Sequence, residues 1–214
     1  MGRSAKQVGN EVSFSILAIG AHPDDIELGC GASLAKYAKA GARIRAIVMS
    51  KGRRGALDDT DRAAETARSF EKVGIVDSTI YDFDDTNLAQ SLNEIVATIA
   101  THLEEFAPTR VYTMFEHDRH QDHRAVYEAS AVACRHVPQL LGYETPSSYP
   151  NFRPTLFEDI GDFLEQKVAA LQCHESQRDR LYMQEDKVRA AAHFRGVQVD
   201  RGPCEGFLPY KMML

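Results

Sequence analysis

The chain has 214 residues, 43% of them hydrophobic, and a formal net charge of −6. This length supports one buried core, and we expect a flexible N-terminal segment over residues 1–12 and a single domain over residues 13–214. The acidic charge lacks the broad positive field that binding to nucleic acid requires. The apolar runs are too short to span a membrane and no leader precedes them, so we expect a cytoplasmic protein without a nucleic-acid or membrane partner. A homo-oligomer is compatible with this composition.

The first two thirds of the chain alternate short apolar runs with longer segments of helical period. The pattern predicts strands over residues 14–20, 43–49, 78–83 and 110–115, and helices over 28–40, 59–73, 89–106 and 122–136. This alternation is typical of an α/β protein with a Rossmann-like, doubly wound, mostly parallel sheet and helices on both faces. The fourth strand should return beside the first, so that both end at the topological switch point where such sheets bind ligands.

In the remainder of the chain, the alternation of apolar runs and helical segments is weaker. We expect a strand at 140–143, a loop rich in proline and serine at 145–154, a short strand at 157–160, and helices at 161–173 and 186–193. A loop of that length inside a compact domain is often functional. The four cysteines form no Cys-x-x-Cys pair, so we expect reduced and mostly buried thiols rather than a thiolate zinc site or disulfides.

Side chains of the types that bind metals follow the ends of two predicted strands. The first strand runs into AHPDD over residues 21–25, and the fourth runs into EHDRHQDH over residues 116–123. Together His22, Asp25 and His123 offer two imidazoles and one carboxylate, which leaves a fourth position for water as in catalytic zinc sites. Alone, the paired aspartates would suit a helix N-cap and the histidines an exposed polar loop. Their joint occurrence at neighbouring strand ends favours a divalent-metal hydrolase.

The adjacent carboxylates of Asp24 and Asp25 point in different directions, so we expect one to bind the metal and the other to take a proton from the attacking water. His120 and His123 are three residues apart at the entry to a helix and share a face. One of them would bind the metal while the other points at the substrate.

A dinucleotide-binding or sugar-binding Rossmann module without hydrolytic activity is the main alternative. Gly20, Gly29 and Gly31 follow the first strand, but their spacing differs from the dinucleotide-binding fingerprint. Where a pyrophosphate would bind, the turn carries Asp24 and Asp25, whose charges would repel it. A ferrous site for oxygen chemistry ranks third, because no oxidant site is recognised for it.

A family resemblance adds to these arguments. The run AHPDDIELGCGASLAKYAKAG resembles the N-terminal signature of the PIG-L/LmbE-like N-acetylglucosaminyl deacetylases, and HDRHQDHRAVYEA resembles their second histidine motif. The similarity extends from about residue 14 to residue 207. It implies a zinc-dependent enzyme that removes an acetyl group from the amine of an N-acetylglucosamine-like sugar conjugate. Fe²⁺ or Mn²⁺ is compatible with the same ligands.

The resemblance also implies a role for each residue. The zinc ligands would be His22, Asp25 and His123. Asp24 would be the general base, His120 would stabilise the oxyanion or protonate the leaving amine, and Arg62 would contact the substrate.

Several other residues carry weaker signals. Arg53 and Arg54 would either recognise a phosphate or carboxylate on the substrate or be merely solvated. His102 and His136 are predicted to be ordinary surface residues. His174 is predicted to interact with the last carbonyls of the helix at 161–173.

Overall fold

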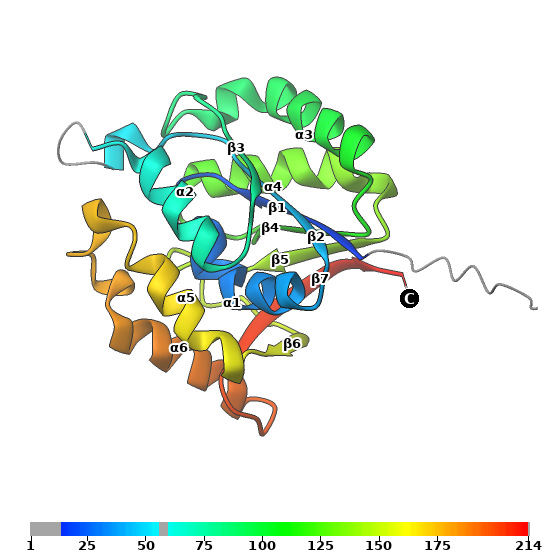
Figure 1. Cartoon of the computed structure of the whole chain (residues 1–214). Helices are drawn as coiled ribbons and strands as arrows, with labels where there is room; N and C mark the ends of the chain where they lie inside the picture. The colour runs from blue at the N-terminus through cyan, green and yellow to red at the C-terminus, as the bar shows by residue number, and fades with distance from the viewer. Residues whose placement is uncertain (1–13, 56–59, 214) are drawn as a thin grey trace, which may run out of the picture.

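A seven-stranded sheet forms the centre of the computed structural model, which describes residues 14–55 and 60–213. Its strand order is β3-β2-β1-β4-β5-β7-β6 (Figure 1). The strands are β1 (Ser15–Gly20), β2 (Arg43–Val48), β3 (Asp77–Ile80), β4 (Arg110–Met114), β5 (Gln139–Tyr143), β6 (Leu156–Asp159) and β7 (Cys204–Met212). Strands β1 to β5 are parallel, whereas β7 is antiparallel to both β5 and β6.

Helices cover both faces of the sheet (Figure 1). Helices α3 and α4 pack together on one face, and α1, α2 and α5 pack on the other, with α6 beside α5 and β7. The helices are α1 (Asp25–Lys39), α2 (Arg62–Lys72), α3 (Leu92–Phe106), α4 (Gln121–Ala133), α5 (Leu164–Leu171) and α6 (Glu185–Val197). None of the helices in the described ranges is long and apolar enough to cross a membrane.

The predicted fold class is confirmed, and so is the return of the fourth strand to a position beside the first. Strand β4 lies beside β1, with Leu17 opposite Val111, so the ends of both strands meet at one edge of the sheet. The predicted helix at 28–40 begins three residues earlier, at Asp25. The predicted flexible segment at 1–12 lies outside the described residues.

Strand β7 has no counterpart among the sequence predictions. It contains Gly206 and Pro209, which both disfavour a strand interior. The register with β5 shifts at Pro209, leaving Tyr210 as the extra residue of a bulge. Pairing with β5 on one side and β6 on the other stabilises the strand despite its weak local propensity. These pairings cannot be inferred from the local sequence.

A buried ion pair spans a bend in α1. The bend lies at Cys30, whose φ of −144° is outside the helical range. On one side of it, the ammonium group of Lys167 donates to the carbonyl oxygen of Leu28 at 2.7 Å. On the other side, the Glu205 carboxylate accepts from the N–H of Ser33 at 2.8 Å, and it also pairs with Lys167 at 2.6 Å. The pair satisfies backbone groups that the bend frees and fixes the first turn of α1 against α5 and β7.

Two of the weaker predictions are corrected. His102 is not on the surface: it is only 7% exposed, and its imidazole is hydrogen-bonded to the Tyr81 hydroxyl at 2.7 Å. His174 does not bind helix carbonyls through its ring, because its Nε2 lies 2.8 Å from a carboxylate oxygen of Glu27 and it is fully buried. His136 is exposed as predicted. All four cysteines are free, and three are buried.

Candidate active site

The turn after β1 is held by a side chain rather than by ordinary helix capping. The Asp25 carboxylate accepts hydrogen bonds from the backbone N–H groups of Ala21 and His22, at 3.1 and 2.7 Å. Asp24 occupies the N-cap position of α1, yet its side chain makes no capping hydrogen bond and its φ of 96° is left-handed. Such a conformation costs a residue other than glycine about 1–3 kcal/mol and concentrates at functional sites. Simple capping therefore does not account for the paired aspartates.

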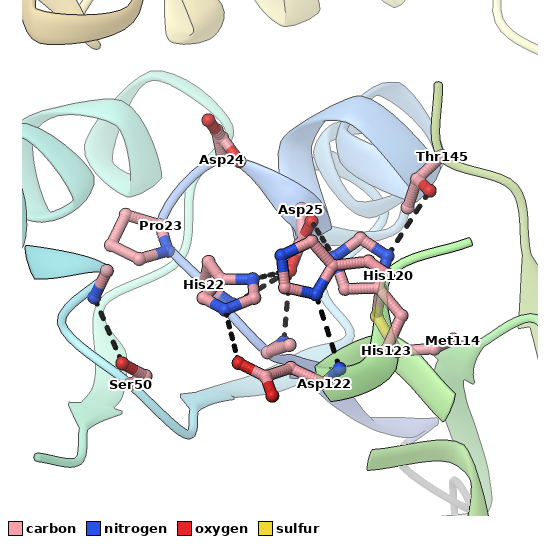
Figure 2. Close-up of polar contacts among 12 residues, drawn as sticks. His22, Pro23, Asp24, Asp25, Ser50, Met114, His120, Asp122, His123 and Thr145 are labelled. Atoms are coloured by element: carbon pink, nitrogen blue, oxygen red, sulfur yellow. Dashed lines mark hydrogen bonds and ion pairs between the residues drawn. The ribbon is translucent and has the colours of Figure 1, made fainter. Parts of the chain in front are cut away.

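Two imidazoles converge on Asp25 (Figure 2). Nδ1 of His22 lies 3.6 Å from one carboxylate oxygen of Asp25, and Nε2 of His123 lies 3.3 Å from the other. All three side chains are buried. The strand ends 21–25 and 116–123 thus come together as the sequence predicts.

The outward nitrogen of each imidazole is held by a further buried carboxylate. Nε2 of His22 lies 3.0 Å from Asp122 and 3.2 Å from Asp85. Nδ1 of His123 lies 3.2 Å from Asp118. A carboxylate behind each histidine is the arrangement that orients metal-binding imidazoles and raises their basicity. It leaves Nδ1 of His22 and Nε2 of His123 as the nitrogens that face the Asp25 carboxylate.

The electrostatics of this cluster favour a cation. Burial alone would lower the pKa of His22, but hydrogen bonds to Asp122, Asp25 and Asp85 outweigh it and raise the pKa well above its ordinary value. Burial is likewise outweighed at His123, where Asp25 and Asp118 raise the pKa to about 9. Four carboxylates therefore surround two imidazoles, and a positive charge between them is stabilised. Donor types and field both fit a divalent metal ion.

Two groups of donor atoms in the described part of the chain are close enough to hold an ion. One consists of His22, His120 and His123, and the other of His22, Asp85 and Asp122. The second group is less suited to an ion, because the oxygens of Asp122 also accept from the backbone N–H groups of Thr86 and Leu88, at 2.7 and 3.1 Å. Those bonds fix Asp122 as a support for His22.

His120 differs from the other two histidines. Its Nδ1 accepts from the backbone N–H of Asp122 at 3.2 Å, which caps α4 and places the proton of the neutral ring on Nε2. Burial, then the charges of His22 and His123, lower its pKa. His120 thus favours the neutral form and offers an N–H donor at the edge of the cluster.

Asp24 and Arg62 form a second buried pair on the other side of the turn (Figure 2 shows Asp24 pointing away from Asp25). The Arg62 guanidinium lies 3.3 Å from the Asp24 carboxylate and donates to the carbonyl oxygens of Gly52 and Pro23 at 2.8 and 2.9 Å. Gly52 has a φ of 63°, and a Cβ there would lie 2.3 Å from the guanidinium. Burial and the adjacent Asp25 raise the pKa of Asp24 to about 6, although Arg62 opposes that shift.

A cavity of about 320 Å³, which we call the site cavity, is lined by His22, Asp24, Asp25, Arg62, Asp85, His120 and His123. Arg54 belongs to its lining and Arg53 does not; each pairs with an exposed aspartate, Asp84 for Arg54 and Asp82 for Arg53. The predicted functional loop at 145–154 contributes Thr145, Pro146 and Ser147 to the wall.

Sequence reasoning missed the supporting carboxylates. Asp118 and Asp122 lie inside the second motif, which was the only signal that could have pointed to them. Asp122 serves His22, a hundred residues away, and not the adjacent His123. Asp85 follows β3 in a segment that also contains Asp82 and Asp84, so the local sequence does not single it out.

Comparison with a protein-family model identifies a match over residues 17–134, more than half of the chain. The model is that of PIG-L, described as GlcNAc-PI de-N-acetylase. Both motifs, including His22, Asp25 and His123, fall within the matched range.

Individual proteins support the same relationship. An uncharacterized deacetylase of Escherichia coli, YaiS, is 46% identical over 167 residues, which is 75% of this chain and 90% of that protein. Diacetylchitobiose deacetylase of Thermococcus kodakarensis is 28% identical and covers 91% of this chain and 83% of its own length. The crystal structure of the conserved protein TT1542 from Thermus thermophilus superposes with a TM-score of 0.83 at 26% identity, covering 93% of this chain and 95% of that one.

Proposed function

The chain belongs to the PIG-L family of deacetylases, and from that premise we propose that it is a metal-dependent hydrolase that removes the N-acetyl group from an N-acetylglucosamine-like sugar conjugate. The main support for the proposal is the way in which carboxylates hold the imidazoles of His22 and His123. Each has one nitrogen against Asp25 and the other against a buried carboxylate, Asp122 for His22 and Asp118 for His123.

His22, Asp25 and His123 are the proposed ligands of one zinc ion, with Fe²⁺ or Mn²⁺ as alternatives suited to the same donors. A divalent ion held there would polarise the amide carbonyl and lower the pKa of a bound water to about 7. The outer carboxylates Asp118, Asp122 and Asp85 keep the two imidazoles oriented and supply negative charge.

Asp24 is the proposed general base. It lines the same cavity as His22, Asp25 and His123, so it can accept a proton from a water bound in that cavity. The left-handed backbone at Asp24 and the hydrogen bonds of Arg62 to the turn fix its position.

His120 is the proposed donor to the reacting carbonyl oxygen or to the leaving amine. Its Nδ1 is occupied by the N–H of Asp122, so its Nε2–H is the group that it can offer to a substrate. A neutral N–H donor aimed at a developing oxyanion stabilises the transition state.

Arg62 remains a predicted substrate contact, because it lines the site cavity. Its hydrogen bonds to Pro23, Gly52 and Asp24 also support a role in holding the turn. The substrate class comes from the relatives, one of which is named for diacetylchitobiose. A small-molecule substrate and a cytoplasmic location are predictions that accompany this proposal.

Deacetylation is favoured over the dinucleotide-binding alternative, because the comparisons identify deacetylases and the turn after β1 carries two carboxylates. The test is release of acetate and free amine from N-acetylglucosamine conjugates, measured before and after chelation and again after zinc is added back. We expect chelation to remove activity and zinc to restore it. Tight NAD binding with no amine release from any conjugate would overturn the proposal.

A further inference from the structure

The loop after β5 is tied to the loop that carries the second histidine motif. We call residues 145–149 the wall loop, because they form part of the wall of the site cavity. The backbone N–H of Arg119 donates to the carbonyl oxygen of Ser147 at 3.0 Å, and the backbone N–H of Tyr149 donates to that of His117 at 3.0 Å. The two loops therefore lie side by side and are joined through their backbones.

Three hydroxyl groups of the wall loop converge on the carboxylate of Asp118, which is fully buried. The hydroxyl of Ser147 donates to one oxygen at 2.6 Å, and the hydroxyls of Thr145 and Ser148 donate to the other at 2.8 and 3.2 Å. The backbone N–H of His120 adds a bond of 2.8 Å to the first oxygen. Hydrogen bonds to an ionised group are stronger than those between neutral groups, so the wall loop fixes the orientation of this carboxylate.

The same carboxylate holds a proposed metal ligand. An oxygen of Asp118 lies 3.2 Å from Nδ1 of His123, whose Nε2 faces Asp25. The hydroxyls of Ser147 and Thr145 lie 3.3 and 3.5 Å from the same Nδ1 (Figure 2 shows Thr145 beside the imidazoles). The group that accepts the outer N–H of a metal-binding imidazole sets the orientation of the ring. An unbroken chain of polar contacts thus connects the wall of the site cavity to His123 through Asp118.

We propose that Thr145 and Ser147 are positioning residues that act on His123 through Asp118 and couple metal binding to the order of the wall loop. This inference rests on the proposed function, because it takes His123 as a metal ligand. An ion bound to Nε2 fixes the ring, so Asp118 must stay where Nδ1–H points and hold the two hydroxyls in place. By linkage, a substrate that restrains the wall loop strengthens metal binding by the same factor as the metal strengthens substrate binding.

Variants without one hydroxyl test the effect of the loop on the metal. Thr145→Val and Ser147→Ala should each weaken zinc affinity about 3- to 10-fold, less than an outer carboxylate itself contributes. Thr145→Ser keeps the hydroxyl and should retain the wild-type affinity. Thr101→Val is the matched control, because the Thr101 hydroxyl donates to a carbonyl oxygen within α3. The measurement is a titration with a competing chelator. Wild-type affinity in both Thr145→Val and Ser147→Ala would overturn the inference.

Hydrogen exchange of the wild-type protein tests the effect of the metal on the loop and requires no variant to fold. The reporters are the backbone N–H groups of Ser148 and Tyr149, each in a hydrogen bond of 3.0 Å. We expect them to exchange at least about threefold more slowly in saturating zinc than in chelator, while amides in the middle of α3 exchange equally in both. Equal exchange of the wall-loop amides in both conditions would overturn the inference.

Asp118→Asn tests whether the coupling passes through this carboxylate. The variant replaces one of the two accepting oxygens by an NH₂ group, so it cannot accept from the imidazole and from both hydroxyls. At a zinc concentration that saturates it, we expect the wall-loop amides to lose their zinc-dependent protection, and retained protection would contradict the inference. Zinc binding without a response of the loop would overturn this inference alone, whereas absence of zinc binding by the wild type would overturn the proposed metal-dependent function as well.

Discussion

The site cavity and the bend in α1 both contain buried charge but balance it in opposite ways. Around the site cavity, carboxylates crowd against imidazoles, and the raised pKa of His22 and of His123 reflects a field that a cation would relieve. At the bend in α1, Lys167 and Glu205 compensate each other and bind backbone groups of the helix. In this comparison the unbalanced buried charge lies at the proposed metal site, and the balanced Lys167–Glu205 pair serves as structural support.

The sharpest test of this contrast is removal of a proposed ligand. His123→Ala should lose bound metal, which we expect at about one ion per chain in the wild type, and should reduce deacetylation to background. Metal content by mass spectrometry and amine release are measured together. His136→Ala, which alters an exposed histidine, is the control. Full metal retention by both His123→Ala and His22→Ala under a chelator would show that the ligands are assigned wrongly.

Substitution should distinguish the roles of the two adjacent carboxylates, Asp24 and Asp25. Asp24→Asn is expected to keep the ion and lose about 10²- to 10⁴-fold in kcat, because a neutral amide cannot accept the proton. Asp25→Asn should also weaken metal retention, because an amide is a poorer ligand for a dication than a carboxylate. If Asp24→Asn loses the ion while Asp25→Asn keeps it, the two roles are reversed.

A smaller effect is expected from the carboxylate behind His123. Asp118→Asn should weaken metal affinity about 10- to 100-fold, although we do not assign Asp118 as a ligand. The measurement is a titration with a competing chelator. Asp82→Asn, at an exposed aspartate paired with Arg53, serves as the control. Affinities equal to the wild type in both variants would remove Asp118 from the proposed support of His123.

The buried pair at the bend in α1 should affect stability more than turnover. Glu205→Gln leaves the Lys167 ammonium buried without a counter-charge, and we expect a loss of about 3–5 kcal/mol in the free energy of unfolding. Lys167→Met should cost less, because Glu205 keeps its backbone N–H donors on α1. Urea unfolding measures both. A larger loss for Lys167→Met would mean that the hydrogen bond to Leu28 dominates.

The two regions also differ in how much of each could be predicted from the sequence. His22, Asp25 and His123 follow strands β1 and β4, whose apolar runs are unmistakable, and the topology of parallel sheets brings those strand ends together. The support from Asp122 to His22 joins residues a hundred positions apart and has no local signature. The pair at the bend depends on β7, where Gly206 and Pro209 conceal the strand.

The contact between Glu205 and the amides of α1 has a consequence for biosynthesis. The carboxylate pairs with the N–H of Ser33 across 172 residues of sequence. During translation, the first turn of α1 and both aspartates of the AHPDD motif emerge from the ribosome long before Glu205 is made. Contacts of such separation form late, because the loop between them must first close. The bend in α1 therefore reaches its native hydrogen bonding only once strand β7 has been synthesised and inserted between β5 and β6.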